Sequence, residues 1–290
     1  MNVRSQVAEG AWRRQRQWSM AARNGRARLE KWRRVNLTLL VVGAILGAVA
    51  AQSGWPRGVT GTAAGGAALA LTMAGIVQRR YLNPEAVARW TGARAASETL
   101  KAEVFRYRTG VPPYDDADRD STLSARVAAI QERTAALMLD LQQTPADDRA
   151  LPEVSDFASY VEQRARQQAD WHQGKIAGHV QAARRIRFAE LAATAVAALL
   201  GAIAAGLDTK GLAIWIGVAT IIGAAFAAHL SATQRDRIAA GYAATADRLD
   251  LLIEQLPAAP DAATQAQFVA NVESILAAQN ETWLGLLAPK

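Results

Sequence analysis

The side chains that could do chemistry in this chain are few and scattered. The three histidines are His172, His179 and His229, and there is no cysteine. His172 and His179 lie seven residues apart, and no third ligand stands at the spacing of a metal site. An enzyme needs a nucleophile, an acid–base pair or a metal held in a pocket. Because the sequence offers no such set, we expect no enzymatic activity, no cofactor and no metal.

Two ionisable residues stand inside long apolar segments, where charged groups are functional candidates by default. Glu190 lies near the start of one segment and His229 near the end of another, so both side chains can reach water. Glu190 is three to six residues from Arg184, Arg185 and Arg187. We therefore expect a salt bridge at Glu190 and no proton relay.

Four apolar segments of about 20 residues each match the thickness of the hydrocarbon core of a bilayer. The segments are Leu37 to Trp55, Gly58 to Val77, Phe188 to Leu207 and Gly211 to Leu230. Three of them contain no Asp, Glu, Lys or Arg, and the remaining one contains only Glu190. The linker within each pair is long enough only for a turn. The sequence therefore predicts an all-α membrane protein with two two-helix transmembrane hairpins.

Basic residues around these segments predict how the hairpins cross the membrane. Within about 15 residues of the segments, the four outer flanks carry 15 Lys or Arg, whereas the two turns carry only Arg57 and Lys210. Such residues concentrate on the cytoplasmic side of a membrane. We therefore expect both termini, and the long helices outside the membrane, to lie in the cytoplasm.

A basic segment, Arg13 to Arg34, precedes the first apolar segment. Residues 1 to 35 hold ten Lys or Arg and two acids, a net charge of +8, whereas the whole chain carries +7. Next to a membrane span, such a segment fixes topology and attracts anionic lipids. Arginine also makes bidentate contacts to phosphate, so a nucleotide-phosphate site is the alternative. We expect no specific nucleic acid as a partner.

Small residues recur at helical spacing in the second apolar segment. They form one face that lets another helix backbone approach closely. The candidates in the second segment are Gly61, Thr62, Gly65, Thr72 and Gly75. In the first segment, Gly43 and Gly47 are expected to form a similar face. Packing within the chain is one interpretation of these faces. The other is that they build contacts between subunits of a homo-oligomer or line a pore.

The two halves of the sequence resemble one another, which predicts a duplication. "EGAWRRQRQW" and "EQRARQQADW" share Glu, Arg, Gln and Trp 153 residues apart, each before a basic stretch and two apolar segments. We expect one two-span repeat over residues 1–145 and a second over 146–290. The shared residues, which we expect to pack helices at the membrane surface, include Glu9, Arg13 and Trp18 and their counterparts Glu162, Arg166 and Trp171.

Amphipathic helices are predicted outside the apolar segments. One starts after Asn83 and carries Trp90, Leu100 and Val104 on one stripe. Further helices are expected over about 123–141, from the last apolar segment to about 256, and near the end of the chain. The stripe predicts packing against another helix. If that helix belongs to another protein, the chain would instead be a membrane scaffold that docks cytoplasmic partners.

Three stretches of the chain resemble a known family. "YVEQRARQQADWHQGK" (160–175) and "FVANVESILAAQNETW" (268–283) are similar to the opening and closing helices of the SMODS- and SLOG-associating two-transmembrane effector (SLATT) family. "RAASETLKAEVFRYRTGVPPY" (94–114) is similar to the stretch that follows the second span in such proteins. The chain thus resembles two concatenated copies of the SLATT unit.

The resemblance implies a bacterial inner-membrane effector that assembles into a pore or ion channel when a nucleotide-sensing partner triggers it. It also marks four charged residues as candidates for packing or sensing, because the second copy has lost or changed them. These are Arg94, Glu98, Lys101 and Glu103. The equivalent positions of the second copy are Ala243, Asp247, Asp250 and Leu252.

Overall fold

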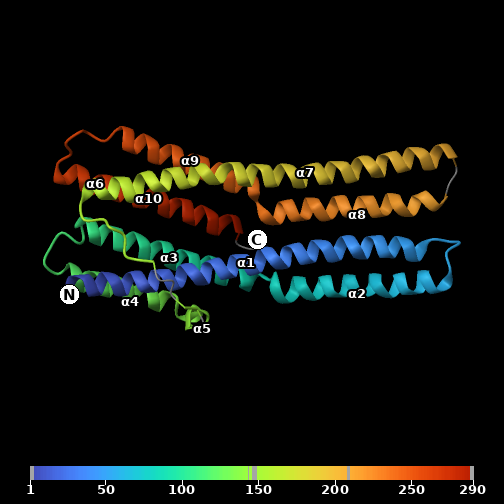
Figure 1. The fold of residues 1–290 in the computed structure, drawn as a ribbon, viewed down its shortest axis with the longest axis horizontal. Helices are drawn as coiled ribbons and strands as arrows, with labels where there is room; N and C mark the ends of the chain where they lie inside the picture. Colours follow the sequence, from blue (N-terminus) through green and yellow to red (C-terminus); the bar gives the residue numbers. More distant parts are fainter. Residues whose placement is uncertain (1–2, 143, 146–148, 208–209, 288–290) are drawn as a thin grey trace. The chain divides into compact units, whose positions relative to one another are not determined.

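The computed structural model describes residues 3–142, 144–145, 149–207 and 210–287, and every regular element in that part is helical (Figure 1). The predicted all-α fold is confirmed. The helices are α1 (Val3–Ala51), α2 (Arg57–Tyr81), α3 (Pro84–Thr109), α4 (Arg119–Arg133), α5 (Met138–Gln142), α6 (Phe157–Tyr160), α7 (Gln167–Leu207), α8 (Lys210–Thr233), α9 (Arg235–Glu254) and α10 (Ala262–Leu287), with a 3-10 turn at Ala135–Leu137 and a π-helical segment at Val161–Arg166.

These helices form two compact units. The first unit comprises Met1–Ala27, Pro84–Ala177 and Arg237–Lys290, and the second comprises Arg28–Asn83 and Gly178–Asp236. Each unit takes residues from both predicted repeats, so the repeats are not the units in which the chain packs. The duplication itself stays a prediction.

The second unit contains the four predicted apolar segments, and their helices are long and apolar enough to cross a membrane. The chain is therefore a membrane protein. The first segment was predicted to reach Trp55, but α1 ends at Ala51. Gly54 has a left-handed φ of 97°, and Pro56 cannot donate a backbone hydrogen bond, so the chain turns before α2 begins at Arg57.

Small side chains allow the helices of the second unit to approach closely. Helix α2 buries one face, made of Ala63, Ala67, Ala70, Ala74 and Val77. A Cβ on Gly43 of α1 would come within 2.8 Å of the Leu71 side chain, so any larger residue there would have to displace that side chain. A Cβ on Gly223 of α8 would lie 3.7 Å from Ala193 of α7. The two helices within each hairpin therefore pack side by side (Figure 1).

The first unit has a core of larger side chains. The predicted stripe of α3 lies inside it, with Trp90, Leu100 and Val104 all buried. Phe105 belongs to a cluster of buried residues that draws on the segment before α7, on α9 and on α10. Its other members are Val154, Tyr160, Ala165, Ala169, Leu249, Phe268, Val269 and Val272.

A single residue separates α8 from α9. Gln234 has φ of 48°, in the left-handed region that non-glycine residues seldom adopt. Its N–H donates to the carbonyl of Leu230 at 3.2 Å, which closes the last turn of α8. The next residue, Arg235, begins α9.

We predict that the cost of a left-handed residue can be measured at Gln234. Gln234→Val should lower the free energy of unfolding by about 1–3 kcal/mol relative to Gln234→Gly, because a β-branched side chain is strained at positive φ and glycine is not. Thermal unfolding in detergent, followed by circular dichroism, would measure the difference. Equal midpoints for the two variants would contradict a left-handed Gln234.

Candidate functional site

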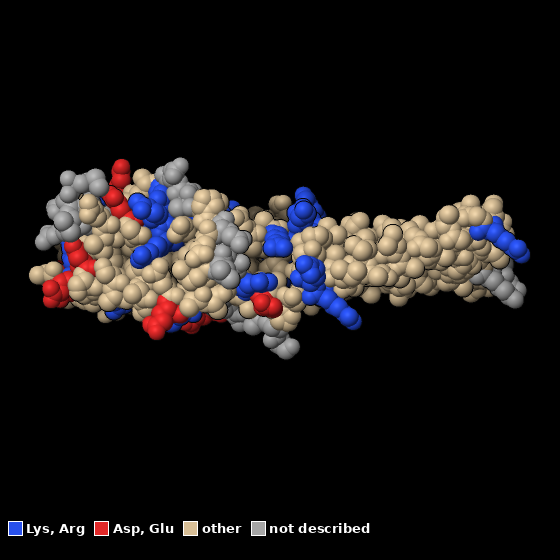
Figure 2. Space-filling view, turned by 90° about the horizontal axis from the view of Figure 1, so that it is seen from below, with Lys and Arg blue, Asp and Glu red and all other residues tan. Residues whose placement is uncertain are grey.

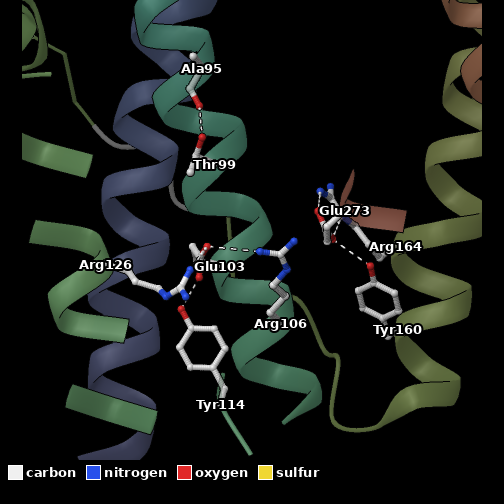
Figure 3. Close-up of polar contacts among 9 residues, drawn as sticks. All are labelled: Ala95, Thr99, Glu103, Arg106, Tyr114, Arg126, Tyr160, Arg164 and Glu273. Carbon is white, nitrogen blue, oxygen red and sulfur yellow. Dashed lines mark hydrogen bonds and ion pairs between the residues drawn. The ribbon is translucent and has the colours of Figure 1, made fainter. Parts of the chain in front are cut away.

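A buried ion pair lies in the first unit between the π-helical segment and α10. Arg164 donates from Nε to Oε1 of Glu273 at 2.9 Å and from Nη2 to Oε2 at 2.8 Å (Figure 3). The Tyr160 hydroxyl donates to Oε1 of Glu273 at 3.0 Å. Both charged side chains are at most 2 % exposed. Such a two-pronged contact is the strongest geometry for an arginine and a carboxylate.

The surroundings of this pair set its charge state. Burial raises the pKa of Glu273, but the charge of Arg164 and the hydrogen bonds from Arg164 and Tyr160 outweigh burial, so the pKa falls below its usual range. The guanidinium of Arg164 lies 4.7 Å from the centre of the Phe105 ring, which stabilises the cation from its other side. Glu273 is therefore ionised.

The Arg164–Glu273 pair was not predicted from the sequence. The residues predicted in the same stretch, Glu162 and Arg166, form an exposed pair at 3.0 Å across one helical turn. Such surface pairs contribute little to stability. The signal that could have found Glu273 is its place in "FVANVESIL", where an acid interrupts an apolar helix face.

A second network surrounds Glu103 of α3, which is buried. Oε1 of Glu103 lies 3.2 Å from Nη1 of Arg126 and 3.6 Å from Nη1 of Arg106 (Figure 3). The Tyr114 hydroxyl donates to its Oε2. Burial, followed by this hydrogen bond to Glu103, raises the pKa of the Tyr114 hydroxyl. The network ties the loop after α3 and helix α4 to α3.

The other three charged candidates of α3 also lie within the first unit. Arg94 donates from Nε to Oδ1 of Asn280 in α10 at 3.2 Å. Lys101 is partly buried; burial, then the nearby charge of Arg164, lowers its pKa to about 8. Glu98 acts electrostatically on both Lys101 and Arg164. The structure thus connects the candidates on α3 with α10 and with the π-helical segment.

The residues shared by the two halves do not occupy equivalent environments. Trp18 is fully buried, whereas Trp171 is 42 % exposed, and Glu9 and Arg13 are exposed. Four buried positions of α1 have buried counterparts 154 residues later, not 153, because the π-helical segment takes up one residue more. The buried pairs are Ala11 and Ala165, Gln15 and Ala169, Trp18 and His172, and Leu29 and Ala183.

The small-residue face of α2 is not the face that packs within the chain. Gly61, Thr62, Gly65, Thr72 and Gly75 are all exposed. A Cβ on any of the three glycines would meet no atom within 4 Å. The Thr62 hydroxyl donates to the carbonyls of its own helix, at 2.9 Å to Gly58 and 3.0 Å to Val59, so it faces outward without an unpaired donor.

The remaining sequence candidates are placed as follows. Gly43 packs against α2, whereas a Cβ on Gly47 would meet no atom within 4 Å. Glu190 is partly buried in α7, and Arg187, one of its expected partners, pairs instead with Asp236 at 2.7 Å. His229 is partly buried near the end of α8.

Comparisons with known proteins identify two regions. Residues 160–283 match the family model described as SMODS and SLOG-associating 2TM effector domain 1. Residues 16–122 match a family described as a protein of unknown function, DUF4231. Each range includes one pair of apolar helices. No match to a curated protein or to a solved structure was found.

We predict that Glu273→Gln costs about 3–5 kcal/mol of unfolding free energy at pH 7, because it leaves Arg164 as an uncompensated buried charge. The matched control is Glu162→Gln, which removes the exposed carboxylate of the same segment and should cost less than about 1 kcal/mol. Chemical denaturation in detergent would measure both. Similar losses in the two variants would show that burial does not strengthen the Arg164–Glu273 pair.

We also predict a stability change at alkaline pH due to Lys101. The pKa of Lys101 is about 8 in the folded chain, whereas an unperturbed lysine, as in the unfolded chain, has a pKa of 10.5. Between these two pH values the unfolded chain therefore binds more protons than the folded chain. Stability should therefore rise as pH increases from 8 to 10.5. Lys101→Met should abolish that rise and stabilise the protein at pH 7 by on the order of 1 kcal/mol.

Unfolding midpoints measured from pH 7 to pH 10.5 would check the effect of Lys101. Lys175→Met, at an exposed position, should leave the rise intact. A rise that persists in Lys101→Met would assign it to another group.

Proposed function

Since residues 160–283 match the SMODS and SLOG-associating two-transmembrane effector family, we propose that this chain is an effector of a bacterial conflict system that assembles into an oligomeric pore or ion channel in the inner membrane. The membrane helices and the family match support the membrane effector. The pore rests on a further observation in the second unit.

The observation that carries the pore is the uncovered face of α2. Membrane helices associate by close packing of small residues, because lipid tails are as apolar as leucine and give no hydrophobic driving force. The face around Gly61, Gly65 and Gly75 has room for another backbone, while α2 packs against its own chain through a different face. A second copy of the chain is the partner that this face fits.

A water path requires several copies. The buried face of α2 is filled by alanine and valine side chains, so this helix offers no polar lining toward the rest of its own chain. Thr62 and Thr72 stand on the outer face and would line or flank the pore in an assembly. The basic flanks of the apolar segments orient both termini and the first unit to the cytoplasm. There, a nucleotide-sensing partner would supply the trigger.

The scaffold interpretation has less support. Docking through the α3 stripe would need its side chains at the surface, but Leu100 and Val104 are completely buried in the first unit. A partner helix could reach them only if that unit opened. No other observation favours a scaffold.

We predict that Gly65→Leu breaks the assembly. The substitution meets no atom of its own chain, so its effect should fall on contacts between chains. Light scattering in detergent, with the detergent contribution subtracted, should show a fall from an oligomer to a smaller species. Ion flux from liposomes should fall in parallel.

The matched control for Gly65 is Gly217→Leu. Gly217 is an exposed glycine of α8 that also has no atom within 4 Å of a Cβ. This variant should keep the parent mass and flux. A monomeric parent protein would overturn the proposed pore at rest, and an unchanged mass in Gly65→Leu would exclude this face of α2 as the contact.

A further inference from the structure

A cluster of positively charged and titratable side chains in the second unit has no role in the proposed pore. It brings together Arg33 of α1, His229 near the end of α8, and Arg235 at the start of α9, all partly buried. Arg33 and Arg235 lie close enough for their charges to repel, and both act on His229. Three helices therefore converge on one small region of positive potential.

The acidic residues near this cluster leave it positive. Glu30, three residues before Arg33 on α1, attracts Arg33. Asp236 is next to Arg235 in sequence, but its Oδ2 lies 2.7 Å from Nη2 of Arg187. The Asp236 carboxylate is thus already paired outside the cluster, and Glu30 is the one acid among the described residues that acts on Arg33.

Arg235 also has a donor that nothing satisfies. Its Nε is buried and has no hydrogen-bond partner among the described residues. Buried donors are normally paired, so an unpaired one indicates a missing acceptor. The left-handed Gln234 lies immediately before Arg235, so Arg235 is the first residue of α9 after the break between the two helices.

The cluster lies at the ends of the apolar segments, where the headgroup layer of a bilayer would begin. Arg33 stands four residues before the first apolar segment, and His229 is the penultimate residue of the fourth. Figure 2 shows Lys and Arg side chains gathered where the long uncharged part of the surface begins. The lipid headgroups, with their phosphates, form a polar layer on either side of the hydrocarbon core.

We propose that Arg33, Arg235 and His229 form a binding site for the phosphate group of an anionic lipid headgroup. Phosphate oxygens would accept from the unpaired Nε of Arg235, and guanidinium groups bind phosphate through paired hydrogen bonds. The negative charge would relieve the repulsion between Arg33 and Arg235. Inorganic phosphate offers the same chemistry, so the test must separate the two sources.

The test is native mass spectrometry of the full chain released from detergent, titrated with phosphatidylglycerol and, separately, with phosphatidylcholine. Arg33→Gln and Arg235→Gln should each weaken the tightest phosphatidylglycerol site about tenfold, as expected for the loss of one charge-assisted contact. The matched control is Arg34→Gln, which removes a charge at an exposed neighbouring position. It should change that affinity less than about twofold.

Thermal unfolding gives a readout that a purely structural role would not move. Because the cluster repels itself, Arg33→Gln should unfold at the same or a higher temperature than the parent in lipid-free detergent, yet gain less from added phosphatidylglycerol. Equal weakening by Arg34→Gln would overturn the site and leave only a general surface charge. Displacement of phosphatidylglycerol by millimolar inorganic phosphate would overturn the assignment to lipid.

Discussion

The first unit depends on one charged contact that is fully enclosed by protein, that of Arg164 with Glu273. An isolated charge in such a place would be prohibitively costly, so each side chain is tolerated only because the other is there. The contact joins the π-helical segment to α10, and Phe105 brings α3 to the same point. Around it, aromatic rings of Tyr160 and Phe105 pack edge to face at 6.1 Å. Helices far apart in the sequence are thereby held in one register.

The second unit is held together by a different principle. Its helices pack through alanine and glycine, and the close approach at Gly43 shows how little space separates α1 from α2. Packing of this kind is specific in shape but weak in hydrophobic energy, because lipid competes on equal terms for every apolar side chain. A buried charged core in one unit and an exposed small-residue face in the other are consistent with the proposed assembly of several copies of the chain.

The helices could be predicted from the sequence, but the contacts between them could not. Length and the absence of charge predicted four membrane helices, since the bilayer imposes both conditions on any span. The stripe of α3 was predicted as a packing face, and Leu100 is indeed buried. The α2 face at Gly65 was identified from spacing, but whether its partner lay inside the chain could not be read from periodicity, which gives a face and not its neighbour.

The buried Arg164–Glu273 pair escaped prediction for a related reason. Arg164 and Glu273 are 109 residues apart, and neither is marked by local sequence as the other's partner. The residues common to the two halves of the sequence include Trp171 as the counterpart of Trp18. In the structure, His172 is the residue that is buried as Trp18 is. Sequence identity between the two halves cannot reveal that a π turn has inserted one residue into a helix.

The wide turn at Val161–Arg166 has a consequence for symmetry. In an ordinary α-helix, which has 3.6 residues per turn, one additional residue would rotate everything after it by about 100° about the helix axis. The π turn takes up that residue, so the buried face continues while the sequence is displaced by one position. Residues that match in the two halves of the sequence can therefore lie on different faces of their helices, as buried Trp18 and exposed Trp171 do.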